Sequence, residues 1–139
     1  MRRLTLCLIA ALIVGTALWA GKQVEFRCGN PKCGFHEEVT FGGGFRFAQV
    51  TGWCTKCQKF VYLTWDRNPQ PQGKAPANPQ PKPVGNIWLP DTGKTVDLYA
   101  CPDCTNPFLP IAGPEELKIC PKCGKPGFGY DPKKVLMFD

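Results

Sequence analysis

The residues best suited to chemistry are eight cysteines, which follow Cys7 as four close pairs. Cys28 and Cys33 are separated by four residues, and each later pair by two. The later pairs are Cys54 and Cys57, Cys101 and Cys104, and Cys120 and Cys123. A tight turn with a two-residue spacer presents two sulfurs to one ion, and tetrahedral Zn²⁺ takes four such soft ligands. The spacing therefore predicts two four-cysteine metal sites.

The lengths between the pairs suggest how they combine. Twenty residues lie between the first and second pairs, and fifteen between the third and fourth, which is enough for a hairpin in each case. We expect each half of the chain to build its own site, the first from Cys28, Cys33, Cys54 and Cys57, and the second from Cys101, Cys104, Cys120 and Cys123. On this grouping, Cys123→Ser unfolds the second half and leaves the first intact.

Short strands should position these cysteines. Aromatic and β-branched residues favour strands over 35–41, 45–51 and 59–65 in the first half, and over 87–89, 95–100 and 135–138 in the second. Three glycines at 42–44 predict a hairpin turn. Residues 90–93, which complete an LPxTG pattern, predict a second turn. No helix is expected in the body beyond at most one turn near 114–116, where proline and acidic residues suit a helix N-terminus.

A proline-rich stretch divides the chain. Six prolines lie between Asn68 and Pro83, and such a run favours an extended spacer over a core element. We predict a leader at 1–21, a first module at 22–66, a linker at 67–83 and a second module at 84–139. A module of this size buries little apolar surface, so it needs a metal or disulfides for stability. The predicted class is a small metal-stabilised all-β protein preceded by a hydrophobic helix.

The first twenty residues read as a targeting segment. Arg2 and Arg3 precede an uncharged apolar run from Leu4 to Ala20 that ends in small residues. This pattern is typical of a secretory signal peptide cleaved after Ala17 or Ala20, and the alternative is a retained transmembrane anchor. We expect the body to be extracytoplasmic, either periplasmic or secreted, or else membrane-anchored. Basic residues on both sides of the run leave the orientation open.

The segment Cys120-Pro121-Lys122-Cys123-Gly124 resembles the knuckle of zinc ribbons and of rubredoxins, and both halves resemble zinc ribbons over 26–65 and 99–130. The resemblance implies two antiparallel hairpins or a three-stranded sheet in each half, with all eight cysteines as ligands of two Zn²⁺ ions. Two departures stand out. The first pair has a four-residue spacer, and Gln58 and Thr105 stand where glycine often follows the second cysteine.

Three other fates for the cysteines remain open. Disulfides suit an exported protein, because it meets an oxidising environment. Iron also takes four thiolates in a tetrahedral site, as in rubredoxin-like carriers. Redox dithiols fit less well, because a thioredoxin-like pair opens a helix after a strand and turn-like sequence follows here. The spacing favours zinc.

The formal charge of +6 is a poor guide to partners. Without Arg2 and Arg3, 15 of the 17 Lys and Arg residues face 11 Asp and Glu, a formal +4. Each zinc tetrathiolate carries −2, so the loaded body is close to neutral. Nucleic-acid affinity needs clustered positive charge, and nucleic acid is therefore not an expected partner.

No residue set predicts catalysis. His36, the one histidine, is expected on an exposed strand beside Glu37 and Glu38, because both metal sites already have four ligands. Several aromatic residues fit either a small-sheet core or a stacking surface for a partner: Phe45, Phe47, Trp53, Tyr62, Trp65 and Trp88.

We therefore expect a non-catalytic, zinc-binding structural or protein-interaction module, exported or membrane-tethered, with no small-molecule substrate. The alternative is a rubredoxin-like iron electron carrier. A further alternative is a zinc ribbon that faces the cytosol and binds nucleic acid.

Overall fold

A computed structural model of the chain describes residues 21–67 and 78–138. These residues form antiparallel strands and two short 3₁₀ turns, with no α-helix among them. The strands are β1 Gly21–Cys28, β2 His36–Phe41, β3 Phe47–Cys54, β4 Lys59–Asp66, β5 Gly85–Leu89, β6 Lys94–Ala100, β7 Pro107–Phe108, β8 Pro110–Ile111, β9 Phe128–Tyr130 and β10 Leu136–Phe138. The turns are η1 Pro114–Glu116 and η2 Pro132–Lys134. Within these ranges no helix has the length and hydropathy needed to cross a membrane. The predicted N-terminal helix lies outside them.

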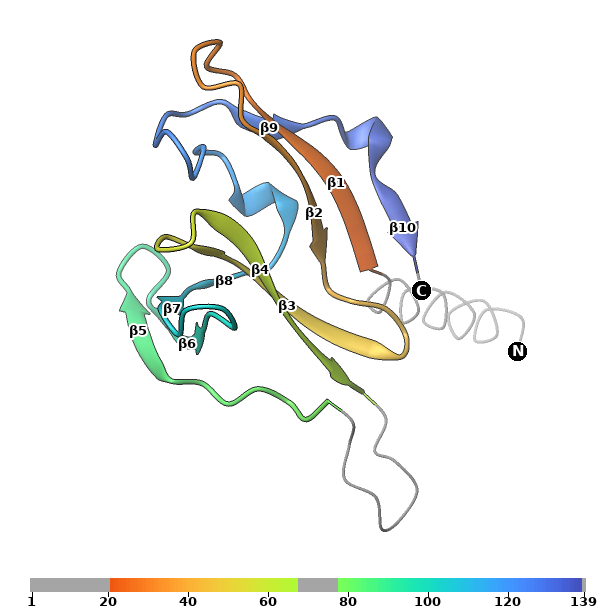
Figure 1. The fold of residues 1–139 in the computed structure, drawn as a ribbon, viewed down its shortest axis with the longest axis vertical. Coiled ribbons are helices and arrows are strands. Elements are labelled where there is room, and N and C mark those ends of the chain that lie inside the picture. Colours follow the sequence, from red (N-terminus) through yellow and green to blue (C-terminus); the bar gives the residue numbers. More distant parts are fainter. Residues whose placement is uncertain (1–20, 68–77, 139) are drawn as a thin grey trace, which may run out of the picture.

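Sheet A joins the two ends of the described chain (Figure 1). Its central strand, β1, pairs with β2 on one side and with both β9 and β10 on the other. The register places Gly21 opposite Phe138 and Phe26 opposite Tyr130. Strands from the second half of the sequence therefore complete the first sheet of the first half.

Two smaller sheets lie beside it. Sheet B has the order β4-β3-β8, in which β8 of the second half adds to the β3–β4 hairpin opposite Thr51 and Gly52. Sheet C has the order β5-β6-β7. Because β8, β9 and β10 all pair with strands of residues 21–66, the two predicted modules share sheets A and B.

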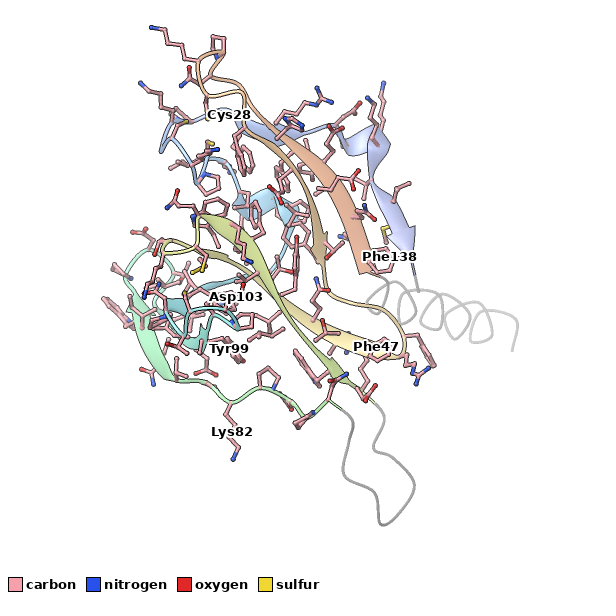
Figure 2. All side chains as sticks on the ribbon, viewed as in Figure 1. Cys28, Phe47, Lys82, Tyr99, Asp103 and Phe138 are labelled. Atoms are coloured by element: carbon pink, nitrogen blue, oxygen red, sulfur yellow. The ribbon has the colours of Figure 1, made fainter. Side chains whose placement is uncertain are left out.

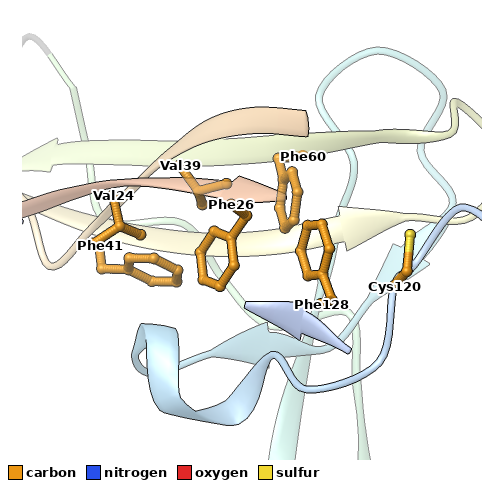
Figure 3. Packing of buried hydrophobic residues seen from close by; sticks show 7 residues of the cluster. All are labelled: Val24, Phe26, Val39, Phe41, Phe60, Cys120 and Phe128. Carbon is orange, nitrogen blue, oxygen red and sulfur yellow. The ribbon is translucent and has the colours of Figure 1, made fainter. Parts of the chain in front are cut away.

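The larger hydrophobic core is aromatic and is built from both halves (Figure 3). Phe26 of β1 stacks on Phe128 of β9 with ring centroids 4.9 Å apart. Phe35 stacks on the same Phe128 ring at 5.8 Å, and Trp53 meets Phe35 and Phe60 edge to face. Such pairs stabilise beyond their buried area. The remaining buried members are Val24, Val39, Phe41 and Cys120.

A smaller core lies around four cysteines, two from each half of the chain: Cys54, Cys57, Cys101 and Cys104. It contains Val61 and Phe108 together with the buried Cys54 and Cys101. Phe108 reaches β3 because Gly52 has no side chain there: a Cβ on Gly52 would lie 2.1 Å from the Phe108 ring. This glycine therefore allows the second half to pack on the first.

The triple-glycine segment does not form the simple hairpin turn that its sequence predicts. Gly42 and Gly43 have positive φ angles of 83° and 73°, as a tight reversal requires. However, β2 and β3 belong to different sheets, so the reversal carries the chain from sheet A to sheet B. Arg67 holds the loop by donating hydrogen bonds to the carbonyl groups of Gly42, Gly44 and Phe47.

The other strand predictions are close to the structure, and the 90–93 turn and the 114–116 turn are confirmed. The sequence prediction missed β1, which is the centre of sheet A. The alternating pattern that indicates this strand is short, because only Val24 and Phe26 are buried apolar residues between polar ones. The strand also directly follows the apolar run of residues 4–20, which makes its start hard to recognise.

Candidate metal centres

The eight predicted cysteines do meet in two groups of four, but the grouping differs from the prediction. Ligand atoms within each group all lie within 4.8 Å of one another. We call the first group the outer quartet, with Cys28, Cys33, Cys120 and Cys123, and the second the inner quartet, with Cys54, Cys57, Cys101 and Cys104.

The expectation that each half builds its own site is therefore wrong. The first cysteine loop pairs with the last, and the second pairs with the third. The physical reason is the strand pairing: β1 carries Cys28 and pairs with β9, which follows Cys123 directly after a short turn. The expectation that Cys123→Ser unfolds only the second half is wrong for the same reason, because Cys123 shares its site with two cysteines of the first half.

The sulfur separations match a tetrahedral metal site. Cys28 and Cys123 Sγ are 3.7 Å apart, and Cys33 and Cys120 Sγ are 3.9 Å apart. In the inner quartet the corresponding distances are 3.5 Å for Cys54–Cys104 and 3.9 Å for Cys57–Cys101. Four sulfurs around a tetrahedral ion with bonds of about 2.3 Å are about 3.8 Å apart.

A disulfide does not fit these distances, since its S–S bond is about 2.05 Å long. All eight of these thiols are free in the structure. The two quartets can thus hold two metal ions, and the donor set of four soft sulfurs suits zinc or iron.

The backbone of each loop turns back in the same way after its second cysteine. The residue at that position has a positive φ angle in all four loops: 60° at Gly34, 55° at Gln58, 62° at Thr105 and 68° at Gly124. In the three two-residue loops its N–H donates to the carbonyl of the first cysteine at 2.8–2.9 Å. The knuckle geometry thus persists where glycine is replaced, at Gln58 and Thr105.

The four-residue spacer of the first loop has a structural explanation in Asn30. Residues Asn30-Pro31-Lys32-Cys33-Gly34 differ from Cys120-Pro121-Lys122-Cys123-Gly124 only at the first position. The Asn30 carbonyl accepts from the N–H groups of Cys33 and Gly34, so Asn30 occupies the place of the first cysteine in the turn. Cys28, two residues earlier, supplies the missing sulfur.

Asn30 is a further residue of this site that was not predicted, although the repeated Pro-Lys-Cys-Gly was a signal for it. Its Nδ2 lies 4.0 Å from Cys123 Sγ and points a donor at that sulfur, while Oδ1 accepts from the backbone N–H of Lys32. A donor at this place stabilises thiolate charge in the outer quartet.

Each quartet has one cysteine that is poised to be the thiolate. The backbone N–H of Cys57, 3.4 Å from Cys54 Sγ, lowers the pKa of Cys54 to about 7, with help from the neighbouring thiols. In the outer quartet the backbone N–H of Lys125 plays the same part and lowers the pKa of Cys123 to about 7.

Other cysteines shift in the opposite direction. The Cys104 thiol and burial raise the pKa of Cys57 to about 12. For Cys28, the backbone N–H of Asn30 favours the thiolate, but burial and the surrounding thiols outweigh it and raise the pKa to about 12. Without a cation, then, a quartet does not readily carry several thiolates. A metal ion supplies the charge that allows all four to ionise.

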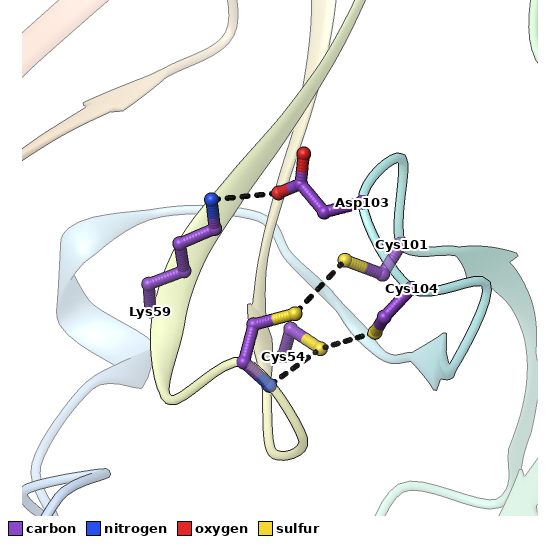
Figure 4. Close-up of polar contacts among 6 residues, drawn as sticks. Cys54, Lys59, Cys101, Asp103 and Cys104 are labelled. Atoms are coloured by element: carbon purple, nitrogen blue, oxygen red, sulfur yellow. Dashed lines mark hydrogen bonds and ion pairs between the residues drawn. The ribbon is translucent and has the colours of Figure 1, made fainter.

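An ion pair lies beside the inner quartet (Figure 4). Lys59, which begins β4, lies 2.6 Å from the carboxylate of Asp103, which stands between Cys101 and Cys104. The Asp103 carboxylate raises the pKa of Lys59. Both side chains are about half exposed, so the pair contributes little stability by itself. It places a positive charge beside the thiolates and joins the two halves.

The remaining predicted residues divide between core and surface. His36 is exposed on β2, as expected, with Nδ1 3.3 Å from the Gly34 carbonyl. Trp53 and Tyr62 pack against the larger core. In contrast, Phe45 and Trp88 are 69% and 61% exposed and belong to no core.

Comparison with known proteins gives no relative for this arrangement. No protein-family model matches the chain, and neither curated proteins nor solved structures gave a significant match. The zinc-ribbon resemblance therefore depends on the cysteine loops themselves.

Proposed function

We propose that the chain is a non-catalytic scaffold in which two structural Zn²⁺ ions fasten the first half to the second. The observation that carries this proposal is the nested pairing of the two quartets, at sulfur distances that suit a tetrahedral ion. The cysteines joined in this way are 95, 87, 50 and 44 residues apart in the sequence. Closing such long loops removes much conformational freedom from the unfolded chain.

The complete sulfur ligand set supports a structural role. A catalytic zinc keeps one position for water or substrate, and here four protein sulfurs fill a tetrahedral ion. Structural zinc contributes about 10–16 kcal/mol of apparent binding free energy per ion, against a net stability of about 5–15 kcal/mol for a whole domain. We therefore expect the metal to determine whether the chain folds.

Metal analysis of natively purified protein tests the proposal. We expect two zinc ions per chain and eight thiols, besides Cys7 where it is retained, that are alkylated after denaturation. A red iron–thiolate spectrum with reversible one-electron reduction would replace the scaffold with an electron carrier. Intact-mass evidence for four disulfides and no metal would contradict both.

We further propose that the scaffold is exported or held at a membrane by its N-terminal segment and contacts another protein. The apolar run from Leu4 to Ala20 supports the first part. The second is supported by β5, where Ile87 and Trp88 are 46% and 61% exposed on a strand that pairs only with β6 among the described residues. An open strand edge with exposed apolar side chains suits a protein partner.

Two measurements test these parts separately. N-terminal sequencing and fractionation of cells establish whether residues 1–20 remain and where the body lies. A photo-crosslinking amino acid in place of Trp88 should give a discrete adduct in cells, while the same group in place of the exposed Thr64 should not. Equal labelling at both positions would contradict a partner site on β5.

A further inference from the structure

Exposed apolar side chains gather where the described chain begins. Leu136, Met137 and Phe138 of β10 are 62%, 54% and 38% exposed, and the three pair with residues 21–23 at the start of β1. The tip of the 42–46 loop adds Phe45, which is 69% exposed. We call these four side chains the apolar rim.

The rim lies directly at the point where β1 begins. A Cβ placed on Gly21 would lie 2.0 Å from the Gly43 carbonyl oxygen and 2.4 Å from the Phe138 ring. The glycine loop and the end of β10 therefore both touch the first described residue. Figures 1 and 2 show this end of the molecule on the side opposite β5.

From this arrangement we propose that the apolar rim rests on the surface of a lipid bilayer. The inference depends on the part of the proposed function in which residues 1–20 are retained and lie in a membrane. The apolar run ends at Ala20 and β1 starts at Gly21, so no spacer separates the two. A strand advances about 3.3 Å per residue, so connectivity alone holds the rim at the surface of that membrane.

The chemistry of the rim suits lipid headgroups. Exposed cationic residues lie near these side chains in the sheet or along the chain. Lys22 pairs with Met137, Arg46 directly follows Phe45, and Lys133 and Lys134 lie in the turn that precedes β10. Apolar side chains beside lysine and arginine are the pattern of interfacial contacts with anionic lipid. Among the described residues, β10 pairs only with β1, and its other backbone edge cannot be left unsatisfied in hydrocarbon. The rim therefore lies at headgroup depth.

Methyl NMR of the full chain in nanodiscs tests the proposal. The discs contain phosphatidylcholine, phosphatidylglycerol and a phosphatidylcholine spin-labelled near its headgroup, and the protein carries labelled Met ε-methyl and Ile δ1-methyl groups. Ile9 and Ile13 report on the leader, Met137 on the rim, and the exposed Ile87 and Ile119 on the rest of the body. We expect Met137 to lose about threefold more intensity than Ile87 and Ile119, because only the rim meets the interface.

The outcomes separate the two claims. Broadening of Ile9, Ile13 and Met137 supports the rim. Broadening of Ile9 and Ile13 without Met137 overturns the rim and leaves the tether standing. No broadening at any of them overturns both. Loss of Met137 intensity without spin label, on raising the protein concentration, would assign the rim to a second copy of the chain and also overturn the proposal.

A variant pair completes the test. Phe45→Gln combined with Leu136→Gln should reduce the broadening of Met137, since both side chains are exposed and their loss leaves the cores intact. The matched control, Ile87→Gln with Ile119→Gln, should leave it unchanged. Equal effects of the two double variants would contradict a specific rim.

Discussion

At the scale of single residues, the four cysteine loops use the same turn with different amounts of strain. Gly34 and Gly124 adopt a positive φ angle without cost, whereas Gln58 and Thr105 have a Cβ in the same conformation. Each of these two side chains hydrogen-bonds a local carbonyl, Gln58 that of Thr55 and Thr105 that of Cys104. The inner quartet is therefore held by two strained loops, and the outer quartet by two relaxed ones.

Thr105→Gly should relieve part of this strain. A left-handed conformation costs a β-branched residue about 1–2 kcal/mol, so we expect a net gain of about 0.5–1 kcal/mol after glycine's greater entropy loss is subtracted. Resistance of the zinc-loaded protein to urea measures the change. The converse variant, Gly124→Thr, should lose a similar amount. A destabilised Thr105→Gly would show that the hydroxyl bond outweighs the strain.

Metal affinity should depend steeply on pH. With pKa values of about 12, Cys28 and Cys57 are protonated at pH 7 and must release protons when a metal binds. Cys54 and Cys123, at about 7, become protonated as the pH falls below 7, so each site then releases one further proton. Affinity should fall with decreasing pH, and more steeply below pH 7. Calorimetric zinc titrations in buffers of different ionisation enthalpy count the protons, and an affinity that is constant between pH 6 and 8 would contradict this.

At the scale of the elements, the joints between sheets depend on small residues at defined places. The ring of Phe108 packs against Gly52 of β3, where a side chain would stand. Thr51 donates a 2.6 Å hydrogen bond to the Thr40 carbonyl, which joins β3 to β2. Gln49 donates to Thr40 and Thr51 in the same cluster. These contacts fix how sheet B lies against sheet A and against the second half.

Gly52→Val should loosen the joint between β3 and the 107–111 segment. The new side chain would overlap the Phe108 ring and approach the Leu109 carbonyl at 2.9 Å, so we expect a loss of about 1–3 kcal/mol. Gly129→Ala in β9 is the matched control, because a Cβ there meets no atom within 4 Å. Denaturant unfolding of the metal-loaded variants makes the comparison, and equal stability of the two would show that Phe108 does not need the space.

At the scale of the whole molecule, the two quartets and the shared sheets make one interlocked structure from a chain that looks divided. The ends of the described chain pair in β1 and β10, and the middle is joined at the inner quartet. Damage to one site should therefore spread to both halves of the sequence.

Cys123→Ser should open the outer quartet and release both loops that form it. Amide NMR signals of β1 and β2 should change together with those of β9, because Phe26 and Phe128 lose their common support. Signals around the inner quartet should persist, since its four cysteines are untouched. Changes confined to residues 84–138 would restore the separate-module interpretation.

Cutting the chain between residues 68 and 77 should leave the halves together. With a protease site placed there, the cleaved, zinc-loaded protein is expected to elute as one species and to separate only after chelation. The reason is that each quartet has two cysteines before the cut and two after it. Separation of the fragments with both metals bound would refute the nested pairing. An uncut sample treated with chelator controls for unfolding alone.

The sequence alone determined the local features of this protein. The close cysteine pairs, the strand compositions and the turn at 90–93 are properties of a few neighbouring residues, and the structure has them near their predicted places. Only the tertiary structure decided which loops share a metal. Each loop offers two sulfurs, and any two loops supply the four that one ion needs, so the spacing of the cysteines does not identify the partner. The partner is chosen by long-range contacts, the pairing of β1 with β9 and the stacking of Phe26 on Phe128, which join residues about a hundred positions apart.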